Sequence, residues 1–255
     1  TLGRGGSDTT AAALGVALEA EVVEIYTDVN GLKTADPRIV SNTKTLDRVT
    51  YNEICQLAHE GARVIHPRAV EIAMQGNIPI KIMCTFSDES GTLVTNSLQL
   101  YEGKPIEGDR LITGITQIVD ITQICIDTSG IEDREFNMNL LSKLAEANIS
   151  IDFINVSLDQ TVFTVPDAVA DKALRIIRQF NVEPVLRRGC AKVAAVGAGM
   201  TGVPGVMARI VKALTKEKIQ ILQSADSYTT IWCLVDNKDM RAAVAALHQE
   251  FGLGE

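Results

Sequence analysis

Residues 135–165 read EFNMNLLSKLAEANISIDFINVSLDQTVFTV, and residues 205–235 read GVMARIVKALTKEKIQILQSADSYTTIWCLV. The two stretches align without a gap at a spacing of 70 residues. The matching positions are Leu140, Leu144, Ile149, Ile151, Ser157 and Val165 in the first and Ile210, Leu214, Ile219, Ile221, Ser227 and Val235 in the second. An internal repeat of this length indicates two copies of one structural unit.

Each copy has the same order of hydrophobic patterns. These predict strand, helix, strand, strand and helix, which is the ferredoxin-like βαββαβ arrangement. The expected elements of the first copy are 122–126, 135–147, 150–156, 161–165 and 168–179, and those of the second are 192–196, 205–217, 219–225, 230–235 and 238–250.

The two copies differ at their ends. The first closes with 182–186 as a fourth strand, whereas the second runs into Gly252 and ends at Glu255. An open sheet edge invites unwanted pairing, so the second copy needs a strand from elsewhere. The segment 111–116, LITGIT, is the expected donor, which would place the first repeat inside the second.

The region before the repeats alternates between helical and strand patterns. Helices are expected at 8–18, 51–60 and 66–75, and strands at 21–26 and 79–83. This alternation favours an α/β layer with a mainly parallel sheet. Residues 96–110, NSLQLYEGKPIEGDR, are polar with Gly and Pro and are predicted to be a linker. The expected fold class is therefore α/β (α+β).

Composition and charge disfavour several classes of function. The 255 residues are 46% hydrophobic, enough for two or three compact modules. The 24 basic against 32 acidic residues give a net charge of −8, which disfavours nucleic acid or an anionic membrane as partner. Five cysteines are scattered singly, and no apolar run approaches the roughly 18 residues that span a bilayer. We expect a cytoplasmic protein with reduced cysteines and no residues dedicated to a metal site.

The segment Gly3-Arg4-Gly5-Gly6-Ser7-Asp8 leads into the first expected helix. Glycines let backbone amides approach an anion, and a helix N-terminus adds partial positive charge. The loop therefore suits a phosphate, although a glycine-rich loop before a helix is equally often a tight turn.

Two further segments carry polar groups. Residues 25–38, IYTDVNGLKTADPR, place Thr and Asp just after a strand, where open α/β sheets bind ligands. The alternative is a surface loop whose Asp and Asn satisfy turns. In residues 61–67, GARVIHP, Arg63 is a candidate for phosphate contact. We interpret His66, which precedes a proline that opens a helix, as structural.

Taken together, GRGGSDTTAAALG, YTDVNGLKTADPR and GARVIHPRAVEIA resemble the C-terminal half of the aspartokinase catalytic domain, a member of the amino-acid-kinase fold. The 70-residue repeat resembles the tandem ACT regulatory domains of that family. The resemblance covers essentially the whole chain and is strongest to the short, monofunctional bacterial enzymes. It implies a partial amino-acid-kinase domain at 1–95, a linker at 96–110, a first ACT domain at 121–188, and a second built from 111–116 and 191–255.

The resemblance implies an activity: transfer of phosphate from ATP, with Mg2+ and without a prosthetic group, to the side-chain carboxylate of L-aspartate. This reaction is the first step toward lysine, methionine and threonine. Arg4 would hold aspartate, with Ser7 and Asp8 beside it. The residues implied at the nucleotide are Gly5, Gly6, Thr27, Asp28, Asp36, Arg38 and Arg63. Arg63 stands where many relatives have Lys, and Lys33 stands where some have an aromatic residue.

The ACT domains imply feedback by an end-product amino acid, usually bound across a dimer. The implied effector contacts are Glu132, Asp133, Arg134, Glu135, Asn137, Ile151 and Asp152 in the first unit, with Met207, Ile221 and Leu222 in the second. Acidic groups such as Glu132 and Asp152 would suit a second amine, which favours lysine or diaminopimelate over threonine. A homodimer through the ACT domains is expected.

One departure stands out. The family's Lys-Phe-Gly-Gly-Thr-Ser motif and the acidic residue on the aspartate side have no counterpart, and residue 1 is Thr. We therefore expect a truncated fragment that does not turn over aspartate alone. A stand-alone amino-acid-binding regulatory subunit is the alternative, although such a subunit would discard most of the kinase region. Another kinase of the same fold, for glutamate or uridylate, is disfavoured by the two ACT-like copies.

Overall fold

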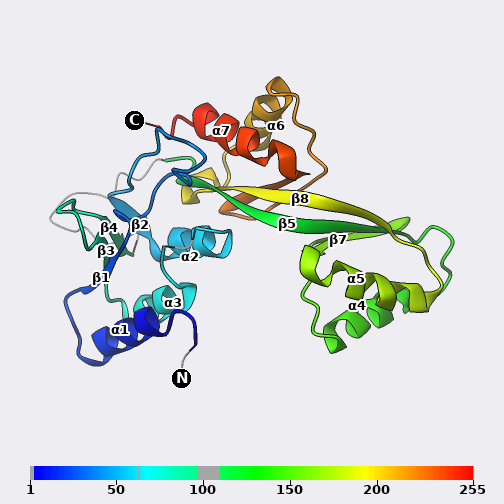
Figure 1. The fold of residues 1–255 in the computed structure, drawn as a ribbon, viewed down its shortest axis with the longest axis horizontal. Helices are drawn as coiled ribbons and strands as arrows, with labels where there is room; N and C mark the ends of the chain where they lie inside the picture. The colour runs from blue at the N-terminus through cyan, green and yellow to red at the C-terminus, as the bar shows by residue number, and fades with distance from the viewer. Residues whose placement is uncertain (1–2, 63, 97–109, 255) are drawn as a thin grey trace. The chain divides into compact units, whose positions relative to one another are not determined.

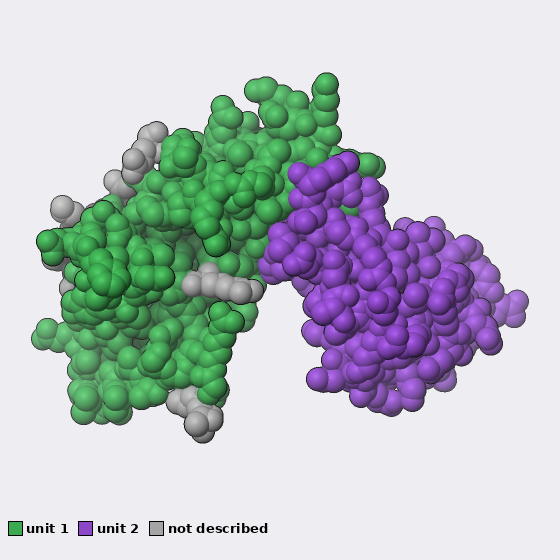
Figure 2. Space-filling model, viewed as in Figure 1, with its two compact units in different colours: residues 1–117, 193–233, 239–255 green, residues 118–192, 234–238 purple. Residues whose placement is uncertain are grey.

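The computed structural model describes residues 3–62, 64–96 and 110–254 (Figure 1). The chain divides into two compact units, coloured in Figure 2. Unit 1 comprises 1–117, 193–233 and 239–255, and unit 2 comprises 118–192 and 234–238. Unit 1 thus combines the N-terminal region with most of the second repeat, and unit 2 contains most of the first.

The N-terminal part of unit 1 follows the predicted alternation. Its elements are α1 (Gly6–Ala17), β1 (Val23–Thr27), β2 (Arg48–Thr50), α2 (Tyr51–His59), α3 (Pro67–Gly76), β3 (Ile80–Cys84) and β4 (Thr92–Thr95). The predicted helices and strands are all present with small shifts at their ends. The two strands not predicted, β2 and β4, have three and four residues, too few for a period-two pattern to be recognised.

Strands β1 to β4 form one sheet in the order β1-β3-β4-β2. β1 is parallel to β3, with Thr27 opposite Cys84, and β2 is parallel to β4, whereas β3 and β4 are antiparallel. The expectation of a mainly parallel sheet is confirmed. α1 and α3 lie side by side against it (Figure 1).

The remaining elements come from the two repeats. They are β5 (Gly114–Asp127), α4 (Phe136–Glu146), β6 (Asp152–Val156), β7 (Gln160–Pro166), α5 (Asp167–Ile177), η1 (Arg178–Phe180), β8 (Val185–Val196), η2 (Ala198–Met200), α6 (Val206–Lys216), β9 (Gln223–Asp226), β10 (Thr230–Asp236), η3 (Asn237–Asp239) and α7 (Met240–Glu250). Adding 70 to the bounds of α4 and β7 gives those of α6 and β10. The repeat read from the sequence is therefore a structural repeat.

β5 and β8 are longer than predicted. The sequence predicted separate strands on either side of residues 117–121 and 187–191, but each pair is one continuous strand of 14 and 12 residues respectively. Asp120 (φ 60°) and Gly189 (φ 65°) lie within these strands. Single left-handed residues of this kind are found at bulges, which bend a strand without ending it. The sequence analysis placed the end of one strand and the start of another on either side of these residues.

The six strands of this sheet are ordered β6-β7-β5-β8-β10-β9, and β5 and β8 contribute residues to both units. In unit 1 the amide of Thr113 donates to the carbonyl oxygen of Val196 at 2.7 Å, so the LITGIT segment lies beside β8, the first strand of the second repeat. This is the pairing expected of a donated strand.

Each unit has its own core. In unit 2, β5, β7, α4 and α5 surround buried side chains such as Ile124, Leu140 and Phe163. In unit 1, Ala194 and Val196 of β8 are buried in the same cluster as the helices and sheet of the N-terminal region, and Trp232 packs against it. The second repeat therefore completes the core of the N-terminal region.

Candidate functional site

The glycine-rich loop leads directly into α1. Gly5 is the N-cap of α1 in the left-handed region (φ 76°), and no side chain caps the helix. Arg4 and Ser7 are exposed and Asp8 is half-buried. The first amides of a helix lack partners within the helix, so this terminus presents donors suited to an anion.

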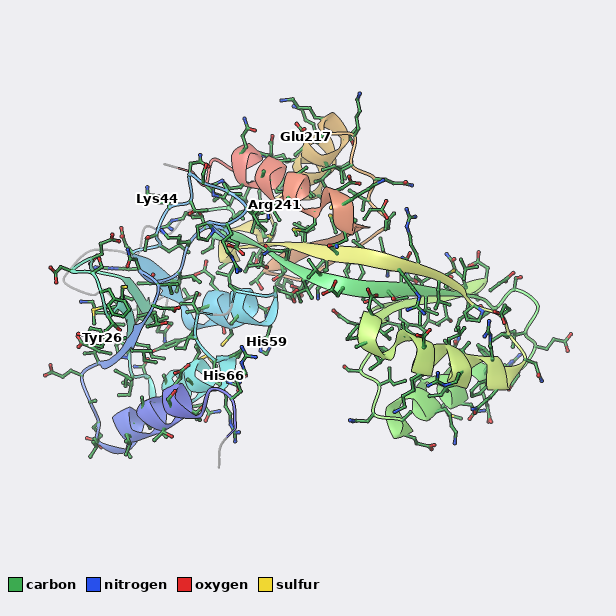
Figure 3. All side chains as sticks on the ribbon, in the orientation of Figure 1. Tyr26, Lys44, His59, His66, Glu217 and Arg241 are labelled. Atoms are coloured by element: carbon green, nitrogen blue, oxygen red, sulfur yellow. The ribbon has the colours of Figure 1, made fainter. Side chains whose placement is uncertain are left out.

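The third motif meets this loop at His66 (Figure 3). The backbone amide of His66 donates to Asp8 Oδ2 at 3.3 Å. The imidazole lies so close to Gly5 that a methyl group on Gly5 would be 2.3 Å from the ring. His66 also caps α3, because its Nδ1 accepts from the amide of Arg68 at 3.3 Å. These contacts give His66 a structural role in shaping the loop. Arg63 lies outside the described residues.

The second candidate segment begins at the carboxyl end of β1. Thr27 Oγ1 donates to Asp28 Oδ1 at 3.1 Å, and the carbonyl oxygen of Thr27 accepts from the amide of Thr85 at 2.8 Å. Thr85 follows β3, the parallel neighbour of β1, and Phe86 next to it is 85% exposed. Sequence reasoning missed both residues, although their position just after a buried strand was a usable signal.

Asp36 and Arg38 form an ion pair with each other. Arg38 Nη2 lies 2.8 Å from Asp36 Oδ2, and Arg38 Nε lies 3.0 Å from Oδ1. The side chain of Arg38 is 86% exposed and that of Asp36 only 16%. Hydrogen bonding and charge from Arg38 lower the pKa of Asp36, with a smaller contribution from Gln117, and Asp36 in turn raises the pKa of Arg38. A phosphate at Arg38 would share the guanidinium with this carboxylate.

The structure brings only some of the predicted catalytic and nucleotide residues into contact. The glycine-rich loop meets His66, and Asp36 meets Arg38, but no hydrogen bond or ion pair links residues 3–8 with residues 27–38 in the described chain. Lys33 Nζ donates to Thr45 Oγ1 at 3.1 Å, so this side chain is engaged within its own loop.

In unit 2, Glu132, Asp133, Arg134 and Glu135 are exposed before α4. Two of the other predicted effector contacts already have partners. Asn137 Oδ1 accepts from Thr161 Oγ1 at 2.8 Å. Asp152 Oδ2 lies 2.6 Å from Lys192 Nζ, whose side chain is only 6% exposed. Asp152 therefore stabilises a buried lysine, and an effector amine would have to compete for it.

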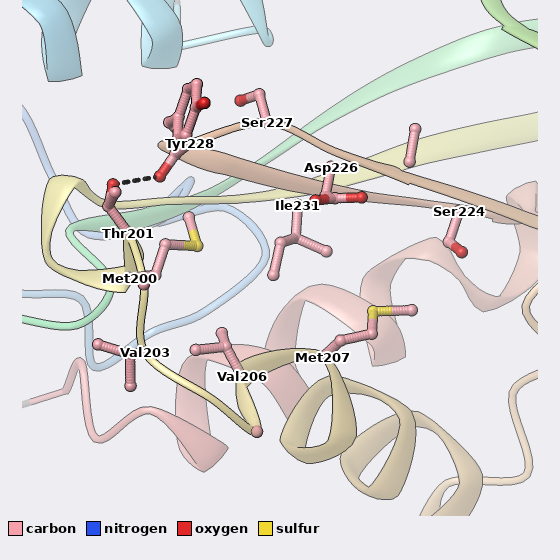
Figure 4. Close-up of a pocket in the computed structure, with 13 residues that line it drawn as sticks. Met200, Thr201, Val203, Val206, Met207, Ser224, Asp226, Ser227, Tyr228 and Ile231 are labelled. Atoms are coloured by element: carbon pink, nitrogen blue, oxygen red, sulfur yellow. Dashed lines mark hydrogen bonds between the residues drawn. The ribbon is translucent and has the colours of Figure 1, made fainter.

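Unit 1 contains a cavity of about 700 Å³ between the start of α6 and the β9–β10 hairpin (Figure 4). Of the predicted effector contacts in this unit, Met207 lines it, whereas Ile221 and Leu222 are not among its lining residues. The lining residues are Met200, Thr201, Gly202, Val203, Gly205, Val206, Met207, Ser224, Ala225, Asp226, Ser227, Tyr228 and Ile231.

The cavity lining combines apolar and polar groups. Met207 from the helix and Ile231 from the strand extend into the space between them (Figure 4). Asp226 supplies a carboxylate at the end of β9. Gly205 is the N-cap of α6 (φ 90°) and, like Gly5, brings no side-chain cap. Sequence reasoning missed Asp226, because its counterpart 70 residues earlier is Val156.

Other site chemistries find no support in the described part of the chain. No group of three His, Cys, Asp or Glu side chains is placed to hold a metal ion there. The five cysteines are free thiols. None of the helices described has the length and apolarity to cross a membrane.

Two family models match the chain. Residues 1–84 match the amino acid kinase family, and residues 185–249 match the ACT domain. The chain is 50% identical to "Aspartokinase 1" of Bacillus subtilis (strain 168) over 255 residues, which cover 100% of this chain and 63% of that protein. It thus spans less than two thirds of the length of this relative.

Solved structures of aspartate kinases also match this chain. The crystal structure of Clostridium acetobutylicum aspartate kinase matches with a TM-score of 0.87 at 30% identity, covering 98% of this chain and 59% of that one. E. coli aspartokinase III matches with a TM-score of 0.80 in its complex with aspartate and ADP, at 29% identity over 98% of this chain and 56% of that one. In its complex with lysine and aspartate it matches with a TM-score of 0.77 and the same coverage.

Proposed function

Because the chain belongs to the aspartokinase family, we propose that it carries the nucleotide-side part of a kinase domain and the paired regulatory domains of an aspartate kinase. The reaction is transfer of the γ-phosphoryl group of ATP to the side-chain carboxylate of L-aspartate, giving 4-phospho-L-aspartate. The observation that carries the proposal is the 50% identity to B. subtilis aspartokinase 1 across all 255 residues. The reaction would begin the pathway to lysine, methionine and threonine.

The roles follow from the chemistry of phosphoryl transfer, which depends on positioning and on neutralising negative charge. Arg4 would bind a carboxylate of aspartate, beside Ser7 and Asp8. Gly5 and Gly6 would let the amides at the start of α1 approach a phosphate. Thr27, Asp28, Asp36, Arg38 and Arg63 would surround the nucleotide. Mg2+ is proposed only as the ion accompanying ATP, since the described residues do not provide a cluster of ligands for it.

A chimera tests this catalytic proposal. We expect the chain alone to leave aspartate unphosphorylated, because no segment like Lys-Phe-Gly-Gly-Thr-Ser occurs in its sequence. Fusing it to the part of B. subtilis aspartokinase 1 that it does not match should give aspartyl phosphate, trapped as the hydroxamate. The Arg4→Ala chimera should raise KM for aspartate. A folded chimera without activity, or turnover by the chain alone, would contradict the proposal.

We further propose that an amino acid regulates the enzyme at the ACT domains. The cavity in unit 1 supports this, because it combines Asp226 for an ammonium group, the start of α6 for a carboxylate and apolar walls for a side chain. Lysine or diaminopimelate is favoured over threonine. The positions carried over from the family, Glu132 to Glu135, Asn137, Ile151 and Asp152 in unit 2 and Ile221 and Leu222 in unit 1, are proposed as effector contacts within their own units. Calorimetry with these three amino acids should give heat with at least one, and no heat with any would refute the proposal.

A cytoplasmic homodimer is the proposed assembly. β6 is an edge strand of its sheet and exposes Ile154 and Val156. A second copy would pair with the free backbone groups of this edge and place its own side chains beside Ile154 and Val156. Light scattering should report a dimer for the wild-type chain and a monomer for Val156→Lys.

We also propose the domain boundaries. The partial kinase domain is 1–95, the linker is 96–110, the first ACT domain is 121–188, and the second ACT domain combines 111–116 with 191–255. Residues 97–109 lie outside the described residues.

The alternative is a regulatory subunit that binds amino acids without a catalytic role. It is supported by the ACT match and the cavity. It is weakened by the 84 residues that match the amino acid kinase family. Heat with an amino acid together with an inactive but folded chimera would favour this alternative.

A further inference from the structure

Residues 34–44 form a loop that carries Asp36 and Arg38, and its base is closed by its own backbone. The amide of Thr34 donates to the carbonyl oxygen of Lys44 at 3.0 Å, and Lys33 and Thr45 form an antiparallel bridge. The base therefore fixes where the loop starts and ends. The direction in which Asp36 and Arg38 project depends on what holds the rest.

The C-terminal helix α7, which belongs to unit 1 as the loop does, holds the rest of the 34–44 loop. The hydroxyl of Thr34 lies 2.9 Å from Nε2 of His248, and the two residues are 4% and 2% exposed. Arg241 Nη2 donates to the carbonyl oxygen of Arg38 at 2.5 Å. Figure 3 labels Lys44, the last residue of the loop, and Arg241 of α7. A segment more than 200 residues away in sequence thus contacts the loop at two points.

The Thr34 hydroxyl has two hydrogen-bond neighbours. Its oxygen accepts from the amide of Lys44 at 3.1 Å. With the imidazole neutral and its hydrogen on Nδ1, the hydroxyl donates to Nε2 of His248; in the other neutral tautomer Nε2–H donates to the second lone pair of the hydroxyl oxygen. Burial lowers the pKa of His248, which favours the neutral ring. His248 is therefore a buried hydrogen-bond partner of one loop hydroxyl in either tautomer.

We propose that His248 is a positioning residue for the nucleotide: by its hydrogen bond with Thr34 it orients the 34–44 loop so that Arg38, held by Asp36, can meet the phosphates. The inference rests on the proposed nucleotide role of these two residues. Leucine at position 248 would nearly fill the volume but leave the Thr34 hydroxyl without this partner. Glutamine would return an amide that can accept from or donate to the hydroxyl.

Three variants of the full 255-residue chain test the proposal: His248→Leu, His248→Gln and His59→Leu, the last altering an exposed histidine at the end of α2. Amide hydrogen exchange across 33–46 measures how firmly the loop is held. Titration with ADP as the probe measures nucleotide affinity. Loss of one buried hydrogen bond should speed loop exchange and weaken ADP binding, each by about fivefold to tenfold.

The expected result is that His248→Leu shows both effects, that His248→Gln restores at least half of each in logarithmic terms, and that His59→Leu matches wild type. Unchanged loop exchange in His248→Leu would overturn the anchoring role. Faster exchange with unchanged ADP affinity would overturn the role in nucleotide positioning. A wild-type chain that binds no ADP would instead refute the nucleotide assignment of Asp36 and Arg38, and with it the function claimed for His248.

Discussion

Lys192 Nζ lies 2.6 Å from Asp152 Oδ2, and the exposure of the two side chains is very unequal: 6% for the lysine and 63% for the aspartate. A buried ammonium group depends on its partner, whereas an exposed carboxylate can return to water. The aspartate is thus needed mainly for the stability of unit 2, whatever part it takes in effector binding.

This asymmetry predicts unequal costs. Asp152→Asn should lower the free energy of unfolding by about 1 to 3 kcal/mol, because the buried charge of Lys192 loses its ion pair with Asp152. Lys192→Met should cost less, because it removes the buried charge itself. Urea unfolding of both variants measures the difference. A larger loss in Lys192→Met would contradict this account.

Gly5 and Gly3 form a matched pair for testing the loop before α1. Both have positive φ, 76° and 71°, but only at Gly5 would a methyl group strike the His66 ring; at Gly3 nothing lies within 4 Å. Gly5→Ala should therefore cost about 1 to 3 kcal/mol more than Gly3→Ala. Hydrogen exchange in the first turn of α1 reports the local cost. Equal effects would mean that the contact with His66 does not constrain the loop.

The stability of unit 1 should fall in mild acid because of His248. Burial lowers the pKa of the folded imidazole below its ordinary 6.5. Below about pH 6.5 the unfolded state therefore takes up a proton that the folded state resists, which favours unfolding. This stabilisation is complete above that pH and is lost as pH falls toward the folded pKa. Chemical unfolding between pH 7.5 and 5.5 should show a flatter profile in His248→Gln, and parallel profiles would disprove the assignment.

Asp226 provides the test of the cavity. Asp226→Asn should weaken binding of an amino-acid effector about tenfold, because the charge-assisted bond to its ammonium group is lost. Glu217→Gln removes a carboxylate from the other end of α6, outside the cavity lining, and should leave affinity unchanged. Calorimetry distinguishes the two. Equal losses would indicate a general effect of net charge.

Local patterns predicted the elements well. The hydrophobic periodicity of the repeat predicted α4, α6, β7 and β10, and the alternation of helical and strand patterns before the repeat predicted α1 to α3. β5 and β8 were predicted in pieces, because Asp120 and Gly189 belong to residue types that occur in turns as well as in bulges, so the residue type does not show that the strand continues through them. The pairing of Asp36 with Arg38 had a readable basis, since the amide of Arg38 donates to Asp36 Oδ1 at 2.9 Å in an Asx turn.

Contacts between distant segments could not be predicted. Thr34 and His248 are 214 positions apart, and nothing in either neighbourhood indicates the other. Asp226 lies in only one of the two copies, so the comparison of repeats that found the fold gave no hint of its role. Carrying effector positions over from a family likewise missed that Lys192 engages Asp152.

The continuity of β5 and β8 limits how this protein can be re-engineered. Three of the four unit boundaries, Gln117–Ile118, Lys192–Val193 and Cys233–Leu234, fall inside the strands β5, β8 and β10. A graft that exchanges unit 2 for another would have to join these strands in register, because a slip of one residue turns every following side chain to the opposite face. Changes to unit 2 are therefore better introduced by substitutions in place than by transplanting the whole unit.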